Sequence, residues 1–205
     1  MIHDLSVQLV SAWHDTSWIE FIAAILAVAY LLLAIGQRLS CWLAAFISSV
    51  LYVWVCFDAR LYMESVLNAY YAAMAVYGFW QWQHGKGGGA LTVNRWPIAR
   101  HALAALGIVA LSLVTAFFLR RYTPAALPFP DSLVAWSSVF TTFLVARKVY
   151  ENWHWWLLID SVSVYLYFTR HLYATMLLFV LYLVLIVMGM REWRRSLPVA
   201  ANAVA

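Results

Sequence analysis

Apolar runs of membrane-spanning length recur along the chain from about residue 18 to about residue 193. A helix of roughly 20 apolar residues crosses the hydrocarbon core of a bilayer. Hydrophobic residues make up 65% of the 205 residues and charged residues 11%, whereas soluble proteins carry about a quarter charged residues. We therefore expect a single all-α integral membrane domain over residues 1–205, with no soluble catalytic module.

We predict seven transmembrane helices separated by short polar segments. The predicted spans are 18–37, 41–57, 61–83, 98–119, 131–146, 152–168 and 172–190, and a basic, weakly structured tail follows over 191–205. Asp131 and Ser132 are a candidate N-cap for the fifth span. The glycine-rich segment 85–89 is expected to be a flexible loop. It is not a phosphate loop, because no strand precedes it and the Walker spacing is absent.

The basic residues between the spans indicate the topology. With the N-terminus outside and the C-terminus inside, nine lysines and arginines lie in cytoplasmic segments and four lie outside. Cytoplasmic segments of membrane proteins are enriched in these residues. The N-terminus lacks the basic segment and cleavage site of a signal peptide, so we expect it to be retained. The net charge of +4 is therefore a topology signal and does not indicate nucleic-acid binding.

The chain matches itself when it is shifted by 111 residues. Identities fall without a gap between residues 42–82 and 153–193. They include Trp42/Trp153, Val53/Val164, Phe57/Phe168, Leu61/Leu172, Tyr62/Tyr173, Leu67/Leu178, Tyr71/Tyr182, Gly78/Gly189 and Trp82/Trp193. Chance among apolar residues yields leucine matches easily, but it is less able to yield the tryptophan, glycine and tyrosine matches in one register. We interpret the pattern as an internal duplication.

The duplication predicts an architecture of three helices, one linker helix and three helices. The first repeat would cover 18–83, the linker helix 98–119 and the second repeat 131–190. A shift of four spans preserves direction through the membrane, so the repeats run parallel. Parallel repeats are a plan of membrane transporters, whose substrate site lies near mid-membrane at the repeat interface.

An acid stands inside the sixth predicted span, where hydrocarbon is expected. Asp160 shares a helix face with Trp153, Trp156, Ser163 and Tyr167, at steps of three and four residues. An ionisable group within the bilayer costs roughly 2.5–3.5 kcal/mol on insertion scales and usually faces a cavity or a partner. Because aromatic rings attract organic cations, we predict that this face binds a cationic ligand. The alternative is a carboxyl group bonded to a hydroxyl of a neighbouring helix.

A second polar and aromatic stripe lies in the third predicted span. Glu64, Asn68 and Tyr71 share one helix face there. Glu64 stands only about one turn inside the span, so an interfacial acid is the alternative interpretation. Further candidates for lining the same cavity, each also suited to helix packing, are Ser49, Tyr52, Thr141 and Thr142.

Several classes of seven-helix or membrane protein are disfavoured. A retinal protein needs a lysine in its last helix, but Lys86 and Lys148 lie in predicted loops. The metalloprotease motif H-E-x-x-H and the hydrolase motif G-x-S-x-G are absent. We expect no enzyme, no cofactor and no metal site. Cys41 and Cys56 fall in one predicted helix, roughly 22 Å apart at the helical rise, which is too far for a disulfide.

Several segments resemble the PnuC family of bacterial vitamin transporters. They are Arg147-Lys148-x-x-Glu151-Asn152-Trp153-x-x-Trp156 followed by Asp160, Gly189-x-x-x-Trp193 with its repeat copy Tyr77-Gly78-x-x-x-Trp82, and Phe129-Pro130-Asp131-Ser132. The resemblance implies a seven-helix, SWEET-like fold that forms a homotrimer in the bacterial inner membrane. It implies facilitated diffusion of an unphosphorylated vitamin, usually nicotinamide riboside, which a cytoplasmic kinase then traps by phosphorylation.

The resemblance also assigns roles to individual residues. Trp153 and Trp156 would be the tryptophan pair of the family, close to the substrate and the gate. Asp160 stands where its nicotinamide riboside carriers tend to have asparagine, and Asn68 where they tend to have glutamine. The extra acid makes thiamine an alternative substrate, because its aminopyrimidine N–H groups suit a carboxylate acceptor. A non-transporting receptor or subunit of a membrane complex is the alternative of another class.

Overall fold

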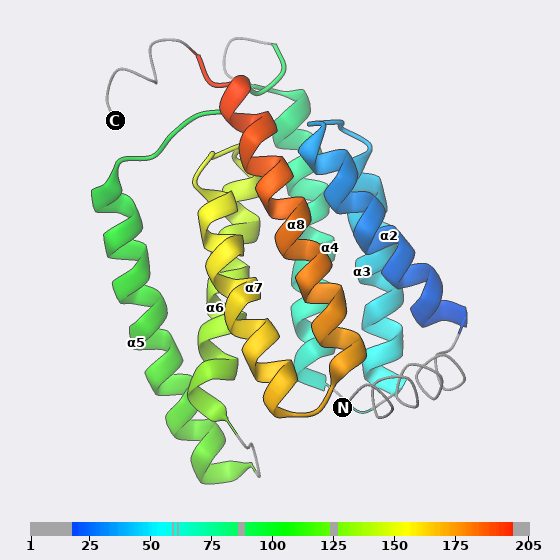
Figure 1. The fold of residues 1–205 in the computed structure, drawn as a ribbon, viewed down its shortest axis with the longest axis vertical. Helices are drawn as coiled ribbons and strands as arrows, with labels where there is room; N and C mark the ends of the chain where they lie inside the picture. The colour runs from blue at the N-terminus through cyan, green and yellow to red at the C-terminus, as the bar shows by residue number, and fades with distance from the viewer. Residues whose placement is uncertain (1–17, 59, 61, 86–88, 124–126, 199–205) are drawn as a thin grey trace.

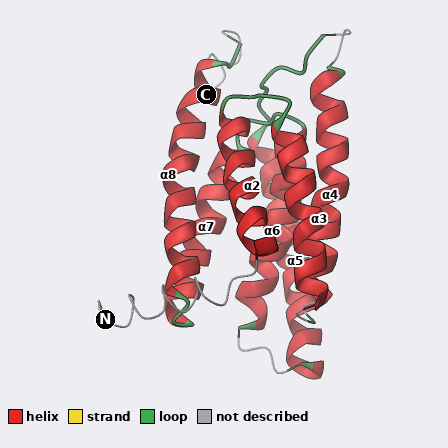
Figure 2. Ribbon diagram, turned by 90° about the vertical axis from the view of Figure 1, so that its right-hand side faces the viewer, coloured by secondary structure: helices red, strands yellow, loops and turns green. Residues whose placement is uncertain are grey.

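The computed structural model describes residues 18–58, 60, 62–85, 89–123 and 127–198, which form seven helices that run roughly side by side (Figure 1). The helices are α2 (Trp18–Ile35), α3 (Cys41–Asp58), α4 (Tyr62–Gln83), α5 (Ile98–Tyr122), α6 (Pro128–Ala146), α7 (Asn152–Thr169) and α8 (Tyr173–Arg195). The described residues form no strand (Figure 2), only an isolated parallel bridge between Asn94 and Val149. The predicted all-α class is confirmed.

Three helix ends differ from the prediction by three residues or more, and one of them is the end of α5, which lies at Tyr122 and not at Leu119. Helix α6 begins at Pro128, its cap residue Leu127 makes no side-chain cap bond, and Asp131 lies in the first turn, so the predicted N-cap at Asp131 and Ser132 is wrong. Proline suits the first turn because that turn needs no backbone N–H donor. Helix α8 continues past residue 190 to Arg195. Residues 1–17, most of the glycine-rich segment 85–89 and residues 199–205 lie outside the described residues.

Four of the helices are long and apolar enough to cross a membrane by length and composition. They are α3, α5, α6 and the Thr175–Arg195 part of α8, while α2 holds the shorter apolar segment Phe21–Ile35. Helix α7 carries the polar residues Asn152, Asp160 and Ser163, all three of which are buried in the bundle, whereas its polar residues His154 and Ser161 are exposed. The three buried polar groups therefore face the protein interior.

The backbone repeats with the same 111-residue shift as the sequence. Gln37 has φ 52° and Lys148 has φ 49°, and Arg60 has φ 59° and His171 has φ 58°. Each of the four follows the end of a helix, where a left-handed residue commonly terminates the helical hydrogen bonds. They are the four non-glycine residues of the described chain with positive φ. Corresponding helices of the two halves therefore end in the same way.

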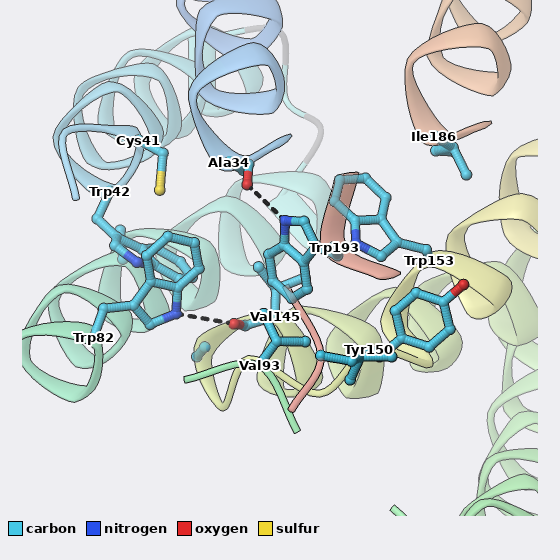
Figure 3. Packing of buried hydrophobic residues seen from close by; sticks show 13 residues of the cluster. Ala34, Cys41, Trp42, Trp82, Val93, Val145, Tyr150, Trp153, Ile186 and Trp193 are labelled. Atoms are coloured by element: carbon cyan, nitrogen blue, oxygen red, sulfur yellow. Dashed lines mark hydrogen bonds between the residues drawn. The ribbon is translucent and has the colours of Figure 1, made fainter. Parts of the chain in front are cut away.

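Four tryptophans form a packed layer at the end of the bundle where α4 and α8 end and α3 and α7 begin. We call Trp42, Trp82, Trp153 and Trp193 the tryptophan layer (Figure 3). The ring centres of Trp42 and Trp82 lie 5.3 Å apart at 84°, and those of Trp153 and Trp193 lie 5.4 Å apart at 87°. The ring centres of Trp82 and Trp193 lie 6.0 Å apart, so this contact connects the two pairs. The two halves of the layer thus have the same geometry.

The halves exchange equivalent hydrogen bonds across this layer. Trp82 Nε1 donates to the Val145 carbonyl at 3.1 Å, and Trp193 Nε1 donates to the Ala34 carbonyl at 3.0 Å (Figure 3). Donors and acceptors in the two bonds are each related by the shift of 111 residues. In the same way, α4 packs on α6 and α2 packs on α8. The contacts between the halves are therefore reciprocal, as expected for a pseudo-two-fold relation.

The segment before α5 is attached to the turn between α6 and α7. Asn94 N donates to the Lys148 carbonyl at 3.0 Å, and Tyr150 N donates to the Asn94 carbonyl at 2.8 Å. The Trp96 N–H donates to Glu151 Oε2 at 3.2 Å. Among the described helices, α5 packs on α6 and lies at one side of the bundle (Figure 1). Many of its apolar side chains are exposed. The linker is thus anchored to the second half.

We predict that Trp82→Phe and Trp193→Phe destabilise the protein by similar amounts. Each change removes one buried indole N–H bond to a carbonyl, and a hydrogen bond contributes about 0.5–1.5 kcal/mol. Thermal unfolding of the purified variants would measure both effects. Trp80→Phe, at an exposed position of α4, is the control. A large loss for one variant and none for the other would contradict the reciprocal geometry.

Candidate functional site

Helix α7 turns its predicted polar and aromatic face toward the bundle. Trp153, Asp160 and Ser163 are buried, and Trp156 and Tyr167 are half-buried. The opposite positions Leu158, Ser161, Tyr165 and Phe168 are exposed. The helical spacing read from the sequence therefore placed these five side chains correctly on one inward face.

Asp160 lies midway along α7 with 4% of its surface exposed. No ion pair to Asp160 is present among the described residues. Its carboxyl group interacts electrostatically with the phenol groups of Tyr71 on α4 and Tyr182 on α8. Tyr71 also hydrogen bonds to Ser138 of α6. The side chains that interact here belong to α4, α6, α7 and α8.

Tyr182 was missed by the site prediction, although the sequence contained a signal for it. Tyr182 is the repeat partner of Tyr71, which was predicted. Because the repeats are related by a pseudo-two-fold relation, a residue that lines the interface in one repeat predicts its partner in the other. The two tyrosines approach the single carboxyl group of Asp160 from different halves. Its own repeat partner, Ser49, is neutral and buried.

A second group of predicted residues lies nearer the opposite end of α7 from the tryptophan layer. Tyr167 interacts electrostatically with Glu64 of α4 and with the ion pair of Asp131 and Arg170. The Arg170 guanidinium donates to both carboxylate oxygens of Asp131, at 2.8 and 2.7 Å. Glu64 is exposed, and its carbonyl accepts a bond from Asn68 Nδ2 at 2.9 Å. This level is more open and more polar than that of Asp160.

The two predicted tryptophans occupy different environments. Trp153 is 2% exposed, and its indole lies beside Trp193 in the tryptophan layer (Figure 3). The same indole lies against Gly189. Its Nε1 has no hydrogen-bond partner among the described atoms. Trp156 is half-buried at the edge of the same core. In this arrangement Trp153 is a packing residue of the layer, and only Trp156 has part of its ring outside the core.

The hydroxyl groups predicted as further lining residues are mostly held by their own helix. Thr141 Oγ1 donates to the Ser137 carbonyl at 2.7 Å, and Thr142 Oγ1 donates to the Ser138 carbonyl at 2.8 Å. Ser163 Oγ donates to the Ile159 carbonyl at 3.0 Å. Tyr52 interacts electrostatically with Tyr182. These oxygens keep acceptor capacity.

Within the described residues, no group of three or more histidine, cysteine or acidic side chains is placed to hold a metal ion. The predicted site residues that are buried or half-buried on α4 and α7 include one buried acid, phenols and a hydroxyl. This set can bind a polar or cationic organic molecule through charge, aromatic surface and hydrogen bonds.

Comparisons with known proteins agree with the resemblance seen in the sequence. The model of the family described as nicotinamide mononucleotide transporter matches residues 17–195. The nicotinamide riboside transporter PnuC of Escherichia coli is 27% identical over 89% of this chain and 87% of its own. The riboflavin/roseoflavin transporter RibM of Streptomyces davaonensis is 30% identical over 92% of each chain.

A solved structure has the same fold. The crystal structure of the vitamin B3 transporter PnuC superposes with a TM-score of 0.71, at 22% identity over 95% of this chain and 88% of that one. The resemblance to PnuC is therefore confirmed, and the protein is a multi-pass protein of the bacterial inner membrane and not an enzyme. With one family model spanning nearly all of it, the chain belongs to the nicotinamide mononucleotide transporter family, which is a family of membrane transporters.

Proposed function

We propose that the protein takes up nicotinamide riboside, a vitamin that carries a fixed positive charge on an aromatic ring. The observation that supports this proposal is the buried Asp160, which has no ion-pair partner among the described residues and interacts electrostatically with Tyr71 and Tyr182. A bound organic cation would supply the missing positive charge. Phenol rings beside a carboxylate form a favourable environment for such a cation.

The proposed architecture has three helices, a linker helix and three helices, all of which cross the membrane. Helices α2–α4 form the first repeat, α5 is the linker and α6–α8 form the second repeat. The reciprocal contacts of the tryptophan layer and the matching helix ends support this arrangement. We propose that the N-terminus faces outward and the C-terminus inward, because this orientation leaves most basic residues in the cytoplasm. A C-terminal reporter that signals outside would reverse it.

The proposed binding residues lie at successive levels along α4 and α7. They are Glu64, Asn68, Tyr71, Trp153, Trp156, Asp160, Ser163 and Tyr167. Glu64, Asn68 and Tyr167 would form an outer level through which the vitamin enters. Tyr71, Asp160 and Ser163 would form the central level, where the ring charge is offset. Trp156 would contact the ring of the vitamin, and Trp153 would support it from the tryptophan layer.

We propose transport by facilitated diffusion, with alternating access between the two sides. The two three-helix repeats would rock about the central level, and the tryptophan layer would close the cytoplasmic end in the described arrangement. A cytoplasmic kinase that phosphorylates the vitamin would then make uptake irreversible. The SWEET-like fold would assemble as a homotrimer in the inner membrane.

Thiamine is the second candidate substrate, and the same acid favours it. Thiamine combines a cationic ring with an aminopyrimidine whose N–H groups can donate to Asp160. Riboflavin, the cargo named for the relative RibM, carries no fixed positive charge. Comparing the three vitamins therefore distinguishes recognition of the positive charge from recognition of any aromatic ring.

Uptake into proteoliposomes tests the proposal. The purified protein would be reconstituted and offered radiolabelled nicotinamide riboside, thiamine and riboflavin separately, and empty liposomes would serve as the control. We expect saturable uptake of a cationic vitamin that an interior-negative potential accelerates. Uptake of riboflavin alone would contradict the role of Asp160. Binding without uptake would favour a receptor or a subunit of a membrane complex.

A further inference from the structure

The turn between α6 and α7 buries a cation at the interface between the halves. Lys148 is 6% exposed, and its Nζ lies 4.4 Å from the centre of the Trp82 ring. The same Nζ donates to Gln37 Oε1 at 3.3 Å, and Gln37 Nε2 donates to Ser196 Oγ at 2.8 Å. Lys148 and Gln37 are repeat partners, so this contact crosses the pseudo-two-fold relation beside the tryptophan layer.

The positive charge of Lys148 is only partly compensated there. No carboxylate of the described residues pairs with it, since Glu151 faces Arg95 and His101 instead. An aromatic ring and one amide oxygen replace the water that an ammonium group prefers, and a buried unpaired charge is costly. Burial accordingly lowers the pKa of Lys148, and the thiol of Cys41 on α3 acts in the opposite direction. Among the described groups, Cys41 is the titratable neighbour that acts on Lys148.

We propose that Lys148 is a positioning residue of transport, whose charge biases the cytoplasmic end of the bundle toward opening. When the halves separate at this end, the ammonium group regains water, and the open arrangement is thereby favoured. Its repeat partner Gln37 is neutral and gains no comparable hydration on opening. The preference for the open arrangement therefore comes from one side of the interface. The inference rests on the proposed function only in taking this end as one that opens.

The effect of pH on this residue has a defined sign. The pKa of Lys148 is lowered in the closed arrangement. As the pH rises, Lys148 therefore loses its proton at a lower pH in the closed arrangement than in the open one. The neutral amine is less costly to bury, so the closed arrangement gains stability as the pH rises toward the ordinary lysine value. Acidification below the lowered pKa removes this gain.

Lys148→Met and Lys148→Arg test the proposal, because methionine keeps much of the length without the charge and arginine keeps the charge. Arg147→Met is the matched control, since the exposed guanidinium of Arg147 lies over Phe143 of its own helix. Hydrogen–deuterium exchange of segments 34–42 and 145–153 reports opening directly. We expect Lys148→Met to slow exchange about 5-fold, the factor that corresponds to a change of about 1 kcal/mol.

The same variant should raise the unfolding midpoint by about 2–4 °C and slow vitamin uptake. Lys148→Arg and Arg147→Met should stay close to the wild type. Once the observed exchange rate is divided by the base-catalysed intrinsic rate, alkaline pH should increase the protection of these segments in the wild type but not in Lys148→Met. Faster exchange or a lower midpoint in Lys148→Met would show that Lys148 stabilises the closed arrangement. Unchanged exchange would show that its charge has no effect on opening. Either result overturns the proposal. If the wild type transports no vitamin, the proposed function fails, whereas the exchange result still decides the role of Lys148.

Discussion

Asp160→Asn is expected to weaken thiamine binding far more than nicotinamide riboside binding. Removing one partner of a buried, hydrogen-bonded charge pair costs about 2–5 kcal/mol, which is about 30-fold or more in the dissociation constant. Thiamine would lose both the charge interaction and an acceptor for its amino group. Nicotinamide riboside would retain hydrogen bonds to the amide, so we expect a loss about tenfold smaller. Calorimetric titration of the purified protein with each vitamin measures both values.

Asp131→Asn is the charge-matched control for this experiment. It also removes one carboxylate, but Asp131 pairs with Arg170 at the far end of α7 and not at the level of Asp160. Its effect on binding should be small for both vitamins. No loss for either vitamin in Asp160→Asn would count against the placement of the substrate beside Asp160. Equal losses would contradict the expected bond between Asp160 and the amino group of thiamine.

The helices were predictable from sequence because hydrophobic length and turn residues determine them. Six of the seven helices begin within one residue of the predicted start. The exception is α6, where prolines at 128 and 130 suggested a loop, whereas the first turn of a helix accepts proline. The end of α8 was placed too early because Arg191, Arg194 and Arg195 suggested a tail. Basic residues also suit the last turn of a helix, and there α8 continues.

The internal repeat was readable from identities, but its packing consequences were not. The sequence does not show that Trp82 and Trp193 bond to carbonyls of the opposite half, because those partners are backbone atoms. Likewise, the left-handed residues that end the helices are Gln37, Lys148 and two others, none of them glycine. Only the folded chain shows that equivalent positions share this conformation.

The candidate site was predictable as a helix face but not as a set of neighbours across the bundle. Spacing along α7 placed Asp160 and Ser163 inward, and it gave Trp153 the same inward direction. Direction alone does not distinguish a ring that lines a cavity from a ring that is packed against Gly189. Tyr182 was missed because the notable features of α8 lay at its end, in Gly189 and Trp193. Combining the repeat with the site would have included it.

Gly78→Ala and Gly189→Ala are expected to be among the most destabilising small substitutions in the chain. A Cβ atom at Gly78 would overlap the indole of Trp42, and one at Gly189 would overlap the indole of Trp153. Both rings are 2% exposed and packed on all sides by the tryptophan layer, so neither can move without disturbing the contacts between the halves. Overpacking of a core costs about 1–3 kcal/mol, and occasionally more.

Gly107→Ala is the matched control, because a Cβ atom at this position of α5 would meet nothing within 4 Å. Alanine favours a helix over glycine by up to about 1 kcal/mol, so this variant should unfold at a slightly higher temperature. The two layer variants should unfold lower by about 2–4 °C for each kcal/mol lost. Trp153→Phe in the Gly189→Ala background makes room for the added methyl group and should recover part of the loss. If Gly189→Ala matched Gly107→Ala, the close approach of α7 and α8 at the tryptophan layer would be wrong. If Gly189→Ala were destabilising and Gly78→Ala were not, the two halves would differ in packing where their backbones are equivalent.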